Sequence, residues 1–123
     1  MIDLDYIWTH CSFEDWDGHG ANALKGVVMQ TARDMFEKFP KICAGEFFEV
    51  TPHSNGTMSF EWEYRDDLYF YLEFGQSDFS AFSRNGEEVL YYPDQYRNGK
   101  IAELPALFEE HISNFINTHG GKK

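Results

Sequence analysis

The sequence predicts an α+β domain, in which a five-stranded antiparallel meander carries N- and C-terminal helices packed on one of its faces. Two observations predict this fold class. Apolar residues recur at helical spacing in stretches near both ends of the chain, and they alternate with period two through its middle. A third observation, the short turns between the alternating segments, indicates that successive strands are antiparallel neighbours.

The helices are predicted from apolar residues that share one helical face. A short helix over residues 3–13 places Leu4, Ile7, Trp8 and Cys11 together. A longer helix over residues 23–39 ends before Pro40, because proline disfavours helical geometry in the preceding residue. In this longer helix the apolar face comprises Val28, Ala32, Met35, Phe36 and Phe39. A last helix over residues 101–118 is followed by Gly120 and Gly121, which are typical of a helix end.

The five predicted strands cover residues 47–51, 58–64, 68–74, 79–83 and 87–92. Asn55-Gly56 and Asn85-Gly86 are strong signals for tight turns between two of the strand pairs. We found no repeat, low-complexity tract or linker, so we expect a single domain over residues 1–119, followed by a flexible tail over residues 120–123.

Alternation assigns the residues of the second and third strands to two faces. One face is apolar, and the two long amphipathic helices are expected to cover it. The opposite face is the predicted partner-binding surface, with carboxylates and tyrosines: Glu61, Glu63, Tyr69, Tyr71 and Glu73. The alternative interpretation is structural, since cross-strand aromatic pairs stabilise sheets whether or not a partner binds.

The chain is strongly acidic. Its 21 acidic and 10 basic residues give a formal net charge of −11, in a chain that is 42% hydrophobic and 18% aromatic. Such a surface repels nucleic acid phosphates and anionic membranes, so we expect neither broad nucleic-acid binding nor membrane binding. The acidity either keeps an aromatic-rich protein soluble or meets a basic partner protein.

The first residues are acidic where a signal peptide would be basic, and no apolar run approaches the length of a membrane span. We therefore expect a cytoplasmic protein. Cys11 and Cys43 are not in CxxC spacing, and in a reducing compartment we expect buried thiols rather than a disulfide.

The segment around Trp16, Asp17, Gly18 and Gly20 is predicted to be a loop, with Asp17 or Asn22 capping the following helix. Gly18 and Gly20 are expected to adopt backbone geometry closed to other residues. Trp16 is expected to anchor the loop in the core, and Trp16 and Trp62 are expected to pack the loop against the sheet.

Neither a metal site nor a catalytic site is predicted. Asp15 begins a partial match to a calcium loop, but its twelfth position is Gly26 rather than glutamate. His10, Cys11, Asp17 and His19 lack the paired ligand spacing of a zinc site. The sequence has no G-x-S-x-G elbow and no phosphate-binding loop. Glu61 and Glu63 could form a carboxylate pair, but we expect an exposed sheet face to leave them solvated. We therefore expect no enzyme activity and no cofactor.

Two motifs resemble those of a group of small bacterial and phage-borne proteins of unknown activity. They are the W-D-G-x-G-A loop that starts at Trp16 and the S-x-E-W strand that starts at Ser59. The turn over residues 51–56 stands where that group has a P-x-x-G-G-like turn, and the resemblance covers roughly residues 15–74. It implies a small α+β protein encoded in mobile or accessory DNA and implies no activity. The C-terminal helix and residues 91–93 have no counterpart in the group.

Together these features favour a non-enzymatic acidic protein that engages a partner protein. The sharpest form of this hypothesis is an inhibitor of a nucleic-acid-binding defence complex, as anti-CRISPR proteins are. The alternative is an antitoxin-type or homodimeric interaction protein. A third hypothesis, an enzyme that uses the loop over residues 15–19, would require a bound metal.

Overall fold

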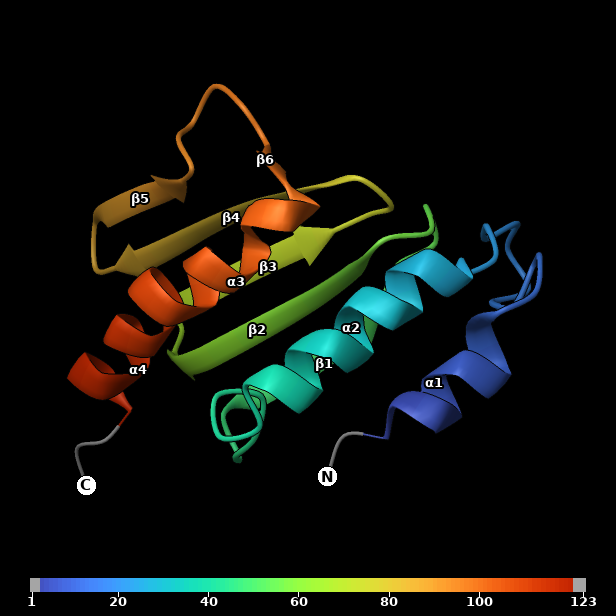
Figure 1. The fold of residues 1–123 in the computed structure, drawn as a ribbon, viewed down its shortest axis with the longest axis horizontal. Helices are drawn as coiled ribbons and strands as arrows, with labels where there is room; N and C mark the ends of the chain where they lie inside the picture. Colours follow the sequence, from blue (N-terminus) through green and yellow to red (C-terminus); the bar gives the residue numbers. More distant parts are fainter. Residues whose placement is uncertain (1–2, 121–123) are drawn as a thin grey trace.

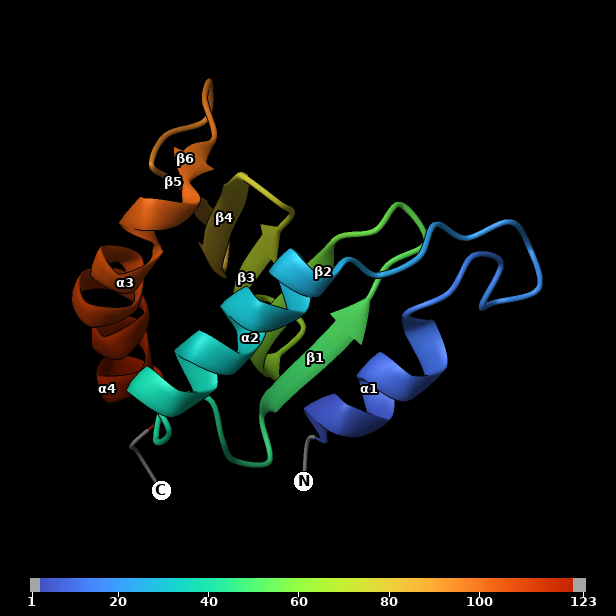
Figure 2. The same ribbon diagram turned by 45° about the vertical axis from the view of Figure 1, so that its right-hand side comes forward.

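The computed structural model describes residues 3–120 and confirms the α+β fold with a meander sheet. In Figure 1 the helices lie in front of the sheet, and the turned view in Figure 2 shows α2 and the C-terminal helices on the same side of it. Helix α1 lies beside α2, away from the C-terminal helices. The helices therefore cover one face of the sheet.

The meander has strand order β1-β2-β3-β4-β5 and every neighbouring pair is antiparallel. Its strands are Phe48–Pro52 (β1), Met58–Arg65 (β2), Leu68–Phe74 (β3), Asp78–Asn85 (β4) and Glu88–Tyr92 (β5). The predicted alternation is clearest in β3, where buried and half-buried residues follow one another along the whole strand. The sequence therefore predicted all five strands and their order.

A sixth strand, β6 (Gly99–Lys100), was not predicted. It pairs with the start of β4, on the same edge that β5 occupies further along. Two residues are too few to show an alternating pattern, and their pairing depends on a contact about twenty residues away in the chain. Gly99 is buried against the ring of Phe79, which leaves no room for a Cβ atom at this position.

Helix α1 (Leu4–Cys11) is capped by Asp3, whose side chain accepts hydrogen bonds from the amides of Asp5 and Tyr6. Helix α2 (Gly26–Lys38) begins three residues later than predicted. The preceding amides have partners in other segments: Asn22 N donates to Ser54 O, Ala23 N to Glu14 Oε2 and Leu24 N to Cys11 O. Residues 22–24 are thus held as an extended connection.

The C-terminal helical stretch was predicted as one helix, and it runs continuously from Ile101 to His119 with changes of pitch. Its parts are a 3₁₀ turn (η1, Ile101–Glu103), α3 (Leu104–Leu107), a π-helical turn (η2, Phe108–Ile112) and α4 (Ser113–His119). Gly120 follows the last turn, and its amide donates to the carbonyl of Ile116 at 2.7 Å. Most of the predicted tail, residues 121–123, lies outside the described residues.

The core lies between the sheet and the helices and is built largely from aromatic rings. Phe60, Trp62, Phe70, Phe74 and Phe108 are each less than 2% exposed. Their rings meet mostly edge to face, as between Phe60 and Phe74 at 5.2 Å. Full burial of such a side chain stabilises the fold by about 1.5–3 kcal/mol, so this cluster anchors the helices to the sheet.

Both cysteines are buried free thiols, as predicted. Burial raises the pKa of Cys11, and it raises the pKa of Cys43 to about 12.

Candidate functional site

The face of the sheet opposite the helices, which we call the open face, carries the predicted partner-binding residues. Within residues 3–120 the helices all lie on the other side of the sheet (Figures 1 and 2). Strand register aligns one row of the open face across all five meander strands: Glu49, Glu61, Tyr71, Phe82 and Tyr91. A neighbouring row contains Glu63, Tyr69, Arg84 and Val89. Glu73 lies in a third row, between Ser59 and Ser80, so the five predicted residues share one surface.

The β1–β2 end of the open face is acidic. Glu49 lies directly opposite Glu61, and Glu63 lies two residues further along β2 on the same face. Partial burial raises the pKa of Glu61, and the charges of Glu63 and Glu49 raise it further. The expectation that this face leaves both Glu61 and Glu63 solvated holds for Glu63, which is exposed, but Glu61 is half-buried and has acidic neighbours.

The β3–β5 end of the open face is aromatic. The ring of Phe82 lies 5.8 Å from Tyr69, 5.5 Å from Tyr71 and 6.1 Å from Tyr91. The loop over residues 93–98 bounds a hollow of about 370 Å³ beside Phe82 and Tyr91. The open face therefore changes from negative charge to aromatic surface in the direction from β1 to β5.

A hydrogen-bonded cluster fixes the predicted residues Tyr71 and Glu73. The hydroxyl of Tyr71 donates to Glu73 Oε1 at 3.0 Å, and the hydroxyl of Thr57 lies 2.6 Å from Glu73 Oε2. Burial raises the pKa of Tyr71 and the neighbouring carboxylate adds to the effect, although a hydrogen bond with Ser59 opposes it. Glu73 is therefore committed to internal contacts, which leaves Glu61 and Glu63 as the freer acidic groups.

His53 also belongs to this cluster. From the sequence it was placed only in the turn over residues 51–56, with no predicted role in the site. Its Nε2 lies 2.9 Å from the hydroxyl of Ser59 and 3.5 Å from that of Tyr71. Alternation had placed Ser59 on the open face, but no spacing rule brings a turn residue back over a neighbouring strand. A contact of this kind becomes visible only in three dimensions.

The loop after α1 is held together by its own carboxylates. Asp17 Oδ1 accepts from the amides of His19 at 2.8 Å and Ala21 at 3.1 Å, and Asp15 Oδ1 accepts from the amide of Gly20 at 2.6 Å. The hydrogen bond from His19 is the main reason that the pKa of Asp17 is lowered. Capping of α2 by Asp17 or Asn22 was a wrong prediction, since α2 has no side-chain cap and Asp17 bonds within the loop. Gly18 and Gly20 have φ angles of +74° and +86°, which confirms their expected role.

The two tryptophans pack separately, contrary to the predicted pairing. The indole N–H of Trp16 donates to Asn22 O at 2.9 Å, within its own loop, while its ring is half-buried against the core. The indole N–H of Trp62 donates to Ile42 O at 2.8 Å, and its ring contacts phenylalanines such as Phe108. Trp62 therefore ties the sheet to the connection after α2, and Trp16 closes the loop.

In the part of the chain that the structure describes, no three His, Cys, Asp or Glu side chains gather in a way that could hold a metal ion. His10, named with Cys11, Asp17 and His19 as a possible ligand, instead stacks on Tyr6 at 4.0 Å, and its Nδ1 lies 2.9 Å from Tyr6 O. Asp15 and Asp17 use a carboxylate oxygen for backbone amides.

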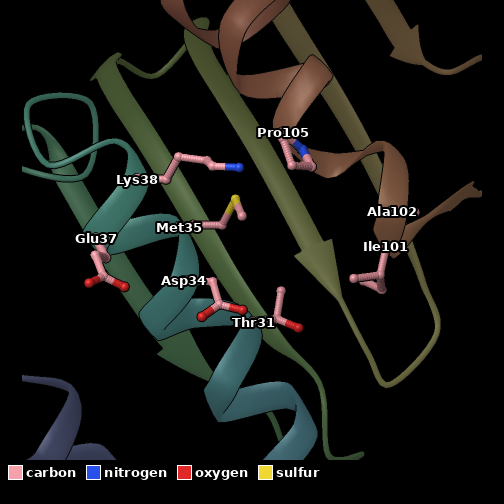
Figure 3. A pocket seen from close by; sticks show the side chains of 8 residues that line it. All are labelled: Thr31, Asp34, Met35, Glu37, Lys38, Ile101, Ala102 and Pro105. Carbon is pink, nitrogen blue, oxygen red and sulfur yellow. The ribbon is translucent and has the colours of Figure 1, made fainter.

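A separate hollow of about 450 Å³ lies on the helix side of the molecule, between α2 and the start of the C-terminal helical stretch. Figure 3 shows Lys38 and Met35 extending from α2 toward Pro105. The lining of the hollow mixes apolar side chains with Asp34, Glu37 and Lys38. This groove carries neither the charge concentration nor the ring cluster of the open face.

Among the helices of residues 3–120, none has the length and apolar character needed to cross a membrane. Comparisons with protein-family models, with curated proteins and with solved structures find no match for this chain.

Proposed function

We propose that this protein is a non-enzymatic binding protein that engages the basic surface of a partner protein through its open face. One observation carries the proposal: the row from Glu49 to Tyr91 places carboxylates and aromatic rings side by side on the face that the helices leave uncovered. Carboxylates attract and orient a basic partner, whereas aromatic rings supply the contact area that stabilises a complex.

The charge of the whole chain supports a basic protein as the partner. A net charge of −11 speeds the approach of a cationic surface and opposes the approach of nucleic acid or an anionic membrane. Near Glu61 the field is concentrated further, because three carboxylates share the β1–β2 end of the face. The proposed mechanism is therefore electrostatic recognition followed by packing of the partner against Tyr71, Phe82 and Tyr91.

A narrower form of the proposal is that the partner is a nucleic-acid-binding protein whose basic groove the open face occupies. Such a protein would act as an inhibitor of a defence complex, like anti-CRISPR proteins, and would work in the cytoplasm. The small size and the acidity of the chain support this form, as does its resemblance to proteins of mobile or accessory DNA.

The test is affinity capture from a bacterial lysate with a matched pair of charge-reversed variants. Glu61→Lys/Glu63→Lys changes the open face, while Glu109→Lys/Glu110→Lys makes the same change in net charge on the exposed side of the C-terminal helical stretch. We expect a basic nucleic-acid-binding protein to be captured by the wild type and by the helix variant, and to be lost with the open-face variant. The purified partner should then lose nucleic-acid binding when the wild-type protein is added, measured by fluorescence anisotropy.

Retention of the partner by a folded open-face variant, checked by circular dichroism, would rule out this face. Equal loss with both variants would show that binding follows net charge rather than the open face. A captured partner that keeps its nucleic-acid binding would remove the inhibitor form alone.

A further inference from the structure

Strand β5 is an edge strand with exposed apolar side chains. Val89, Leu90 and Tyr91 are 38%, 49% and 46% exposed, and they are consecutive. They account for three of the seven large hydrophobic residues that are exposed among the described residues. In Figure 1, β5 lies at the far end of the sheet from β1, with β4 on one side of it. An uncharged apolar edge strand of this kind can form backbone hydrogen bonds with a strand of another chain.

The other edge of the meander shows the contrast. Strand β1 contains Glu49 and ends in Pro52, both of which discourage edge pairing. The central three residues of β5 contain neither a charge nor a proline.

The backbone groups of β5 divide into two sets. Asn85 and Glu88 pair across a two-residue turn, and such a pair exchanges hydrogen bonds directly. Because hydrogen-bonded and non-hydrogen-bonded pairs alternate in an antiparallel ladder, Glu88, Leu90 and Tyr92 direct their amides and carbonyls toward β4. Val89 and Tyr91 direct theirs toward the outer edge.

From this pattern we propose that β5 pairs with β5 of a second copy of the chain, antiparallel, about a two-fold axis at Leu90. In that register Val89 of each copy faces Tyr91 of the other, and each pair exchanges two backbone hydrogen bonds. Leu90 meets its own equivalent on the axis, as a non-hydrogen-bonded pair. All the outward backbone groups of Val89 and Tyr91 are thereby satisfied.

The positions of the charged residues and of Pro93 favour this register over its neighbours. Glu88 comes opposite Tyr92 of the other copy, so no carboxylate faces a carboxylate along the paired strands. Centring the axis on Val89 would instead bring the turn residue Glu87 into the ladder, and centring it on Tyr91 would bring in Pro93, which has no N–H to donate. A self-complementary strand thus accounts for the apolar edge without a second protein.

The pairing would place both open faces on the same side of one continuous sheet. If the open face binds a partner, as proposed above, the dimer would present that surface twice. The dimer itself does not depend on that function, and the tests below use the protein alone.

The first test is disulfide trapping with two variants, each of which adds one cysteine to the wild-type chain. The Cα atoms of a non-hydrogen-bonded pair lie about 4.5 Å apart, which suits a disulfide, so Leu90→Cys should give a covalent dimer under mild oxidation. In Val89→Cys the equivalent Cα atoms would lie about 9 Å apart, beyond disulfide reach, and the variant should remain monomeric on a denaturing gel. Cys11 and Cys43 are buried and do not compete. Failure of Leu90→Cys to cross-link, or equal cross-linking of Val89→Cys, would overturn the register.

The second test is sedimentation velocity over about 1–500 μM, a range suited to a small interface. We expect the wild type to shift from 14.4 kDa toward twice that mass as its concentration rises. Tyr91→Pro removes an outward N–H while leaving the ladder with β4 intact, so this variant should stay monomeric at every concentration. Tyr96→Lys, a control at an exposed aromatic residue outside β5, should dimerise like the wild type. A wild type that stays monomeric throughout, or a Tyr91→Pro variant that dimerises normally, would overturn the proposal.

Discussion

The raised pKa of Glu61 reflects the close spacing of carboxylates on the open face. Glu61 lies directly opposite Glu49 and is partly buried on a strand whose next open-face residue is Glu63. Its pKa is raised above the usual 4.5, first by burial and then by the two neighbouring carboxylates. The folded protein therefore binds a proton at Glu61 more readily than the unfolded chain does, and the ionised group disfavours folding.

Replacement of Glu61 by glutamine should consequently stabilise the protein at neutral pH. The expected gain in the free energy of unfolding is about 0.2–1 kcal/mol, the range for one cross-strand pair. The sign depends on pH: the penalty from Glu61 is present above its folded pKa and disappears as pH falls, so the gain should vanish at about pH 3. Urea unfolding at both pH values measures this difference.

Glu109→Gln, on the exposed side of the C-terminal helical stretch, is the matched control for Glu61→Gln and should change stability little at either pH. A gain for Glu61→Gln that persisted in acid would contradict the electrostatic explanation. No gain at neutral pH would mean that water screens the three carboxylates fully.

Helix α1 depends on its first residue more than on its length. It has eight residues, which is too short for a helix to be stable alone in water. Asp3 accepts two first-turn amides, at 3.0 and 3.2 Å, while Leu4 and Cys11 are the buried residues that hold the helix to the molecule. The cap therefore decides how readily this helix opens.

Asp3→Ala should weaken α1 by about 0.5–2 kcal/mol, because the first-turn amides lose their acceptor. Amide hydrogen exchange should show faster exchange within Leu4–Cys11 and little change in the strands. Asp3→Asn keeps a side-chain oxygen in place and should behave nearly like the wild type. Equal acceleration by both substitutions would indicate that charge, rather than capping, stabilises the helix.

At the scale of elements, the sequence predicted the features that depend on local residue patterns, namely strand positions and the face on which each residue lies. Strict alternation in β2 and β3 located both strands and assigned Glu61 and Tyr71 to the open face. What it could not predict depends on contacts between distant segments. Residues 22–24 lie outside α2, and their amides donate to Ser54, Glu14 and Cys11, which local periodicity does not reveal.

The candidate site follows the same division between local and distant contacts. The five predicted residues do share one face, because that follows from period two alone. The contact of His53 with Ser59 and the raised pKa of Glu61 arise from the turn and from strand pairing, which local periodicity does not encode. The row that extends from Glu49 to Tyr91 needed the register of four strand pairs.

At the scale of the whole molecule, the two faces of the sheet differ in composition. Aromatic rings fill the space between the sheet and the helices, while the opposite face holds carboxylates and tyrosines. Cys43 lies on the buried side of the sheet, between the end of α2 and β1. It is 6% exposed, its amide donates to Phe39 O at 3.0 Å, and its Sγ lies 3.7 Å from Met35 O. Its reactivity should therefore report on the integrity of the whole core.

Cys43 should react with a thiol reagent only when the core opens. Its pKa of about 12 leaves a very small thiolate fraction at about pH 8, which alone slows the reaction about 10³-fold relative to an exposed cysteine. In a Cys11→Ala background we expect labelling of Cys43 to be slow and to accelerate with urea in parallel with global unfolding. Tyr96→Cys in a background lacking Cys11 and Cys43 provides the exposed reference, because Tyr96 is 87% exposed, and it should react rapidly in the folded protein. Fast labelling of Cys43 without urea, or acceleration well before global unfolding, would mean that the connection after α2 opens independently of the aromatic core.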